Sequence, residues 1–129
     1  MQSSKSVEGI LEEIISDEFG SEQSIKSISI VSKTGLMIAG RSASDVRAET
    51  FSAMSAIMFS AAETTRKDII KEDMEKVMVV FSNSVVIISE LSANLLVVAV
   101  ASREIDEDKL MEHLDSIVDR SKAELTWLK

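Results

Sequence analysis

The chain of 129 residues is 45% hydrophobic but only 4% aromatic, and it carries a formal net charge of −8. This length fits one domain, residues 1–129, with an aliphatic core. The negative charge disfavours binding to nucleic acid or to an anionic membrane surface, because both need a basic field. The absence of cysteine excludes disulfides and thiolate chemistry. The first residues lack a hydrophobic signal core, so we expect a cytoplasmic location without membrane insertion.

The first third of the sequence predicts a helix followed by a β-hairpin. From Ser4 to Phe19 apolar residues recur three and four positions apart, which places them on one stripe of a helix that Gly20 ends. The stripe consists of Val7, Ile10, Leu11, Ile14 and Ile15. Ile25 to Ser32 alternates with the period of a strand, and Leu36 to Ala39 returns as a second strand. The turn between them, Lys33-Thr34-Gly35, ends in a glycine that can adopt a positive φ.

The middle of the chain predicts a long helix from Asp45 to Lys67, capped by Asp45 or Ser44. Its apolar side chains fill an arc of about 180°, which is wider than the stripe that one sheet face needs. The arc holds Phe51, Ala53, Met54, Ile57, Met58, Ala61 and Ala62. Phe59 falls outside this arc, so we expect it to be exposed. The wide arc and Phe59 together indicate a second apolar partner, and coverage by the sheet and loops alone is the alternative.

The most hydrophobic part of the chain contains three short apolar runs separated by polar turns. Val77–Phe81, Val85–Ile88 and Leu95–Ala101 are rich in valine and isoleucine and have strand length, so we predict three consecutive antiparallel strands. Ser82-Asn83-Ser84 and Ser89-Glu90 interrupt the stretch, whereas a transmembrane helix needs about 18 continuous apolar residues. Because the runs do not alternate apolar with polar residues, both faces of the sheet should be covered.

The last segment, Ser102 to Lys129, predicts a helix with an acidic start. Its apolar side consists of Leu110, Met111, Leu114, Ile117, Val118 and Leu125. The acids at its beginning are Glu104, Asp106, Glu107 and Asp108, and the helix dipole explains them without a metal. We expect Trp127 to hold the end of the chain on the body of the domain. His113 lies on the polar side of this helix and is expected to face solvent.

Together these elements predict an α+β sandwich with the order αββαβββα. Every connection within a group of strands is a hairpin, so the five-stranded sheet should be antiparallel. The middle helix would cover one face of the sheet, and the two terminal helices would share the other.

The strand Val77 to Phe81 is predicted to lie at a sheet edge that no charge, proline or bulge protects. Pairing with its own copy across a two-fold axis would cover this edge and bring the two middle helices together. We therefore predict a homodimer that buries about 800 Å² per chain. Its interface is expected to contain Phe51, Met54, Met58, Phe59, Ala62, Val77, Met78, Val79, Val80 and Phe81.

The pattern resembles the Roadblock family, the dynein light-chain relatives that regulate and scaffold Ras-like small GTPases. The resemblance covers nearly the whole chain and rests on the element order, the hairpin Ile28 to Ala39, the alanine-rich helix beginning near Ala48 and the run Leu95 to Ala99. Many relatives have Asp-Gly where this chain has Thr34-Gly35. The resemblance implies a profilin-like sandwich and a dimer joined through the third strand and second helix, with itself or with a Roadblock paralogue. It also implies binding of a small GTPase.

No residue pattern points to catalysis, a cofactor or a metal. With one histidine and no cysteine, neither a zinc site nor a Ser-His-Asp triad is supported, so we predict a non-enzymatic protein. The basic side chains that could contact a partner are Arg41, Arg47, Arg66 and Arg103. A guanidinium can reach a nucleotide bound to another protein, and a solvated surface charge is the alternative for each of them.

Two other functions remain open at this point. A small-molecule sensor of the PAS or GAF type would need an internal polar-lined cavity of roughly 300 Å³ or more. The predicted sheet and middle helix offer mainly aliphatic, methionine and alanine side chains for such a cavity. A structural subunit of a larger assembly differs from a GTPase-binding module only in the identity of its partner.

Overall fold

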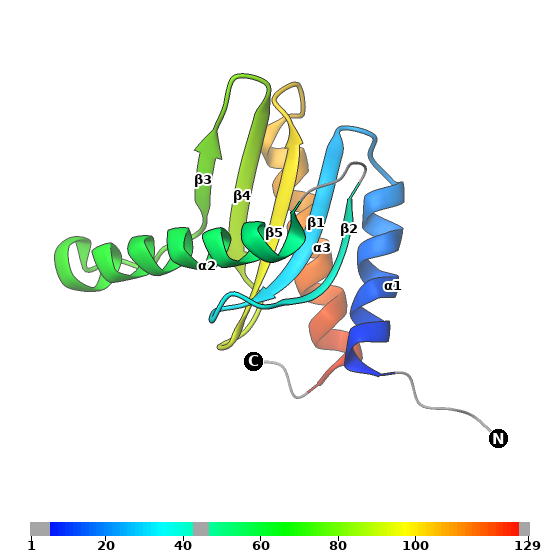
Figure 1. The fold of residues 1–129 in the computed structure, drawn as a ribbon, viewed down its shortest axis with the longest axis horizontal. Helices are drawn as coiled ribbons and strands as arrows, with labels where there is room; N and C mark the ends of the chain where they lie inside the picture. Colours follow the sequence, from blue (N-terminus) through cyan, green and yellow to red (C-terminus); the bar gives the residue numbers. More distant parts are fainter. Residues whose placement is uncertain (1–5, 43–46, 127–129) are drawn as a thin grey trace.

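The computed structural model describes residues 6–42 and 47–126, which form three α-helices, a short π-helix and five strands (Figure 1). In chain order these are α1 (Val7–Gly20), β1 (Ile25–Ser32), β2 (Met37–Ser42), α2 (Ala48–Thr65), η1 (Arg66–Ile70), β3 (Val77–Val80), β4 (Ser84–Glu90), β5 (Leu95–Ser102) and α3 (Glu107–Glu124). The predicted cap at Asp45 or Ser44 and the predicted role of Trp127 lie outside the described residues.

The five strands form one antiparallel sheet in the order β2-β1-β5-β4-β3. Figure 1 shows α2 crossing one face of this sheet, while α1 and α3 cover the other. The predicted α+β architecture, its element order and its layers are therefore confirmed. Strands that are apolar on both sides need such a layer on each face.

Several element ends differ from the prediction, and three of these differences are the largest. The second strand continues to Ser42 instead of ending at Ala39. Beyond Thr65 the helical chain continues as the π-helix η1 up to Ile70. The last helix begins only at Glu107, because the preceding residues form a turn in which Ile105 N donates to Ser102 O at 3.2 Å. The hairpin turn is as predicted, with φ of 99° at Gly35.

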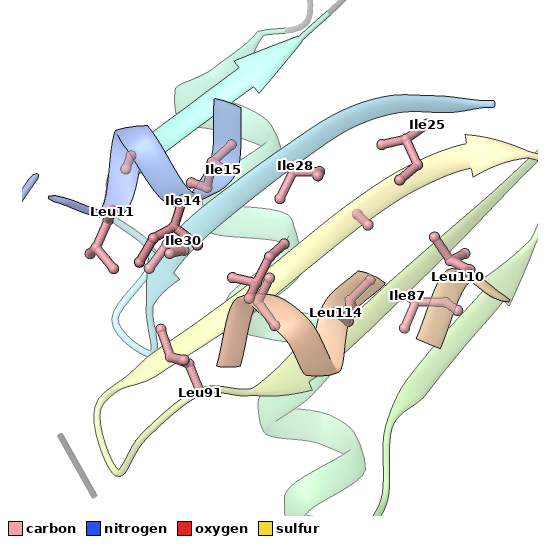
Figure 2. Packing of buried hydrophobic residues seen from close by; sticks show 14 of the residues in the cluster. Leu11, Ile14, Ile15, Ile25, Ile28, Ile30, Ile87, Leu91, Leu110 and Leu114 are labelled. Carbon is pink, nitrogen blue, oxygen red and sulfur yellow. The ribbon is translucent and has the colours of Figure 1, made fainter. Parts of the chain in front are cut away.

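The larger core lies between the sheet and the helices α1 and α3. In Figure 2, leucine and isoleucine side chains from both helices meet isoleucines from the strands. The labelled members are Leu11, Ile14, Ile15, Ile25, Ile28, Ile30, Ile87, Leu91, Leu110 and Leu114. The apolar stripes predicted for the first and last helices therefore face the sheet, and they hold these helices in place by burying aliphatic surface.

The smaller core lies between the sheet and α2, and here the predicted exposure of Phe59 is wrong. Phe59 is only 5% exposed and packs with residues such as Val86, Ile88 and Val98. The buried side of α2 consists of Ser52, Ser55, Ala56 and Phe59. Small side chains let the helix approach the sheet, and the single aromatic ring fills the remaining space. The apolar arc predicted from periodicity therefore faces the sheet only in part, since Phe51 and Met58 pack against this core whereas Met54 and Ile57 are exposed.

The prediction that His113 faces solvent is wrong. Its side chain is largely buried between α1 and α3, where Nδ1 forms a hydrogen bond of 2.8 Å with Glu18 Oε1. Ser116 Oγ donates to the other oxygen of Glu18, Oε2, at 3.1 Å. These three polar side chains join the end of α1 to the middle of α3. The contact depends on the packing of the two helices side by side, which the sequence pattern does not give.

Replacing Phe59 with alanine would leave a cavity beneath α2 and is expected to lower the free energy of unfolding by about 3–5 kcal/mol. Chemical unfolding followed by circular dichroism measures this change. Leu36→Ala is the control, because Leu36 is 67% exposed at the β1–β2 turn and should change the free energy by no more than about 0.5 kcal/mol. Equal effects of the two substitutions would contradict the buried position of Phe59.

Glu22 and Lys109 join the connection before β1 to α3 through a contact of 2.9 Å between Glu22 Oε2 and Lys109 Nζ. The hydrogen bond from Lys109, aided by the backbone N–H of Ser24, lowers the pKa of Glu22 below its ordinary value. A carboxylate with a lowered pKa in the folded state stabilises the fold above its unfolded-state pKa. This contribution is lost as the pH falls through the folded-state pKa.

Glu22→Gln is therefore expected to lower Tm at pH 7, with the difference from wild type shrinking as the pH is reduced to about 3. Thermal unfolding at a series of pH values measures this. Glu72→Gln, at an exposed position between η1 and β3, is the control and should follow the wild type throughout. A difference at Glu22 that stays constant with pH would contradict the assignment to its carboxylate.

Candidate interaction surface

The outer side of β3 is an open sheet edge, because within the described residues β3 pairs only with β4. Phe81 N donates to Ser84 O at 2.8 Å, and the register continues through Val79 opposite Val86. Hydrogen-bonded residues alternate along an antiparallel pair, so the N–H and C=O groups of Met78 and Val80 point away from β4. The edge predicted from the sequence is present, and these two residues carry its outward backbone groups.

The opposite edge of the sheet, formed by β2, is protected. The helix α1 packs against β2, and Gly40 N donates to Glu12 Oε1 at 3.4 Å. The exposed Arg41 also places a charge on this edge. Helical cover, a charge and an occupied amide are ways in which sheets avoid edge-to-edge pairing. The two edges therefore differ, and β3 is the one that is open to another strand.

The side of α2 that faces away from the sheet is apolar. Ile57 is 59% exposed and Met54 is also exposed. At 3.6 residues per turn these two side chains lie opposite Phe59, together with the small residue Ala61. Because α2 contacts β3, the helix that carries this apolar side passes close to the open edge. The second apolar partner inferred from the sequence would therefore meet the outer side of α2.

The residues predicted for the dimer interface differ in how exposed they are. Those that a second chain can reach directly are Met54, Met78, Val80 and Phe81. Those that are half-buried are Phe51, Met58, Ala62, Val77 and Val79, and Phe59 is buried. Val77 and Val79 belong to the smaller core under α2, whereas Met78 and Val80 point to the opposite face of the sheet beside α3.

Two exposed isoleucines were missed in the sequence. Ile69 is 74% exposed and Ile70 is also exposed, both in η1. The π-turn closes with a hydrogen bond of 2.6 Å from Lys71 N to Arg66 O, and Lys71 adopts a left-handed backbone. Figure 1 shows α2 and η1 extending beyond β3. Two adjacent isoleucines among charged residues were the available signal.

Of the four arginines that could contact a partner, Arg41, Arg47 and Arg66 are not brought together. Arg66 Nε and Nη2 both donate to Glu63 Oε1, at 2.9 and 2.7 Å, which raises the pKa of Arg66 and lowers that of Glu63. Arg41 donates to Ser16 Oγ at 3.3 Å and lies over the ring of Phe19. Arg47 is exposed at the start of α2. Arg41 and Arg47 are thus on the β2 side, and Arg66 is on the β3 side.

The layer between the sheet and α2 is filled by the smaller core. At its margin a cleft of about 240 Å³ is lined by Phe59, Glu63, Arg66, Asp73, Met74, Glu75 and Glu90. This volume is below what the sensor hypothesis requires. Among residues 6–42 and 47–126, no three acidic or histidine side chains are placed to hold a metal ion. No helix in the same ranges is long and apolar enough to cross a membrane.

A sequence profile of the Roadblock/LC7 domain matches residues 11–101, from α1 through to β5. The chain belongs to the Roadblock/LC7 family. The resemblance drawn from the element order and the hairpin is thereby confirmed. The matched residues include both the open edge of β3 and the whole of α2. A comparison with curated protein sequences finds no match.

Solved structures share the fold of this Roadblock domain. MglB from Myxococcus xanthus has a TM-score of 0.84 at 10% identity, covering 100% of this chain and 98% of that one. A Roadblock/LC7 domain from Streptomyces avermitilis has a TM-score of 0.79 at 16% identity, covering 89% and 97%. Profilin II from Acanthamoeba castellanii has a TM-score of 0.62 at 14% identity, covering 84% and 94%. The profilin-like sandwich implied by the resemblance is confirmed.

Proposed function

We propose that this Roadblock domain is a non-enzymatic, dimeric interaction module of the cytoplasm that binds a Ras-like small GTPase and regulates or scaffolds it. The observation that carries the proposal is the open edge of β3 beside the apolar outer side of α2. Membership of the Roadblock/LC7 family supports the class of partner. The second chain of the dimer is a copy of this one or a Roadblock paralogue.

In the proposed dimer, β3 pairs antiparallel with its copy around a two-fold axis at Val79. Met78 of each chain then lies opposite Val80 of the other, and their outward N–H and C=O groups exchange hydrogen bonds. The same axis places the two α2 helices side by side on one face of a continuous sheet. Burial of the exposed Met54 and Ile57 there adds apolar contact to the backbone pairing.

Val80→Pro is expected to convert the dimer to a monomer. Proline removes the outward N–H of this residue and places its ring at the pairing edge, while the bonds from β3 to β4 stay intact because they use the alternate residues. Light scattering at micromolar concentration should report the mass of one chain, 14.1 kDa, instead of twice that mass. Circular dichroism should show that the fold is retained.

Val80→Ala is the matched control, because it shortens the side chain and keeps the backbone N–H. This variant should remain a dimer. A dimer that survives Val80→Pro would place the interface away from β3. Val79→Pro provides the complementary comparison, since it removes an amide that faces β4 and should lower the stability of each chain.

The surface of this domain that we propose to bind the GTPase includes both ends of α2. Arg47 and Arg41 are available on the β2 side of this layer, and Arg66 is held on the β3 side by Glu63. A fixed guanidinium suits recognition of a carboxylate or phosphate, because its donors are already oriented. We therefore retain these three arginines as proposed contacts with the partner.

Capture of Ras-like GTPases, loaded either with GDP or with a non-hydrolysable GTP analogue, tests the partner class. We expect binding in at least one nucleotide state, with about tenfold weaker binding by Arg47→Ala if this residue contacts the partner. Arg120→Ala is the control, because Arg120 is paired with Asp17 between α1 and α3. Failure to bind in both nucleotide states would count against a GTPase as the partner.

A further inference from the structure

A small pocket lies between the first turn of α2 and the strands β1 and β2. It has a volume of about 90 Å³, which suits a small ion or a few water molecules, whereas pockets for organic ligands are several times larger. The sheet side of the pocket includes Ser27, Ser29 and Gly40, and α2 contributes Ala48 and Phe51. Because β1 and β2 lie at the end of the sheet opposite β3, this pocket is separate from the open edge.

Ser27 and Ser29 of β1 point toward α2 at this pocket. Their neighbours Ile28 and Ile30 belong to the larger core on the opposite face, and successive side chains of a strand alternate between the two faces. Ser27 is 3% exposed, and its Oγ has no hydrogen-bond partner among residues 6–42 and 47–126. A buried hydroxyl without a partner costs free energy, so a ligand in the pocket that accepts a hydrogen bond from Ser27 would recover this cost.

Gly40 keeps the sheet side of the pocket open. It lies opposite Ser29 in the register of β1 and β2. A Cβ atom at this position would lie 3.2 Å from both Ser29 Oγ and Met37 Sδ, which is closer than an unstrained van der Waals contact. The φ of Gly40 is not positive, so its backbone conformation alone does not explain the glycine. The missing side chain instead leaves space next to Ser29.

The pocket has a positive electrostatic character. The first hydrogen bond of α2 runs from Phe51 N to Arg47 O at 2.8 Å, so the N–H groups just before Phe51 have no acceptor within the helix. No side chain of the described residues caps them, and N–H groups at the start of a helix attract anions. Among the described residues that line the pocket, Arg41 is the one charged side chain. Glu49, the acid of this turn, is exposed and is not part of that lining.

We propose that this pocket binds a small oxyanion of the size of phosphate, either free or as the terminal group of a larger ligand. The hydroxyl of Ser27 and the first N–H groups of α2 donate hydrogen bonds to its oxygens, and Arg41 adds positive charge at the margin. Binding of an oxyanion goes beyond the proposed function. The site lies within one chain, so it does not depend on the dimer.

Titration of the full chain with inorganic phosphate at constant ionic strength, followed by amide chemical shifts in NMR spectra, tests this site. The amide signals of Ser27, Ala48 and Phe51 are expected to shift and to reach saturation. The amide signal of Arg120, in the helix on the other face of the sheet, should stay in place.

Ser27→Ala is expected to weaken phosphate binding by about tenfold or more, because it removes a hydrogen bond to a charged ligand. Ser55→Ala is the matched control. The hydroxyl of Ser55 is also buried without a partner among the described residues, but Ser55 is not among those that line the pocket. Both variants lose an unpaired hydroxyl and should keep a similar Tm, whereas only Ser27→Ala should weaken binding.

Shifts that do not saturate, equal phosphate binding by wild type and Ser27→Ala, or equal weakening by Ser55→Ala would each overturn the site. A parallel titration with glycerol phosphate distinguishes the two sources of the oxyanion. Binding of both probes supports a phosphoryl group carried on a larger ligand, and binding of inorganic phosphate alone supports a free anion. Sedimentation and GTPase capture test the proposed function separately, since a chain that fails in either of them can still bind phosphate.

Discussion

Burial of the central strands on both faces is the constraint on which the fold depends. Successive side chains of a strand point to opposite sides, so Val97 enters the larger core and its neighbour Val98 enters the smaller one. Neither core could form without its own helical layer, because each would otherwise leave a row of aliphatic side chains in water. The placement of α1 and α3 on one face and α2 on the other follows from this requirement.

The interaction surface arises where this two-sided burial stops. β3 is covered by α2 through Val77 and Val79, whereas no helix among residues 6–42 and 47–126 covers Met78 and Val80. Its backbone groups are likewise paired on one side only. An open backbone edge and an apolar outer side of α2 thus occur in the same part of the domain.

The sequence was most informative where the signal is local and strong. Runs of valine and isoleucine predicted the strands, and the order of hairpins placed β3 at an edge. Phe59 was misplaced because periodicity follows residue type, and Ser52 and Ser55 were counted as polar although both are buried. Ser52 Oγ can be buried because it donates to Ala48 O at 2.7 Å. The pairing of His113 with Glu18 and the π-turn of η1 depend on packing and on one main-chain bond, which residue types do not reveal.

The topology also has a consequence for how the chain reaches this structure. The hairpin of β1 with β2 and the meander of β3, β4 and β5 each form from neighbouring segments, but they join only where β1 pairs with β5. That seam matches Ile25 with Ala101 and Ser32 with Leu95, so a long loop containing α2 must close before it can form. Closing a loop of this kind affects the rate of folding more than the stability of the folded state. Pairing of β1 with β5 is therefore expected to be the slow step, and until it is complete each of these two strands lacks one of its neighbours.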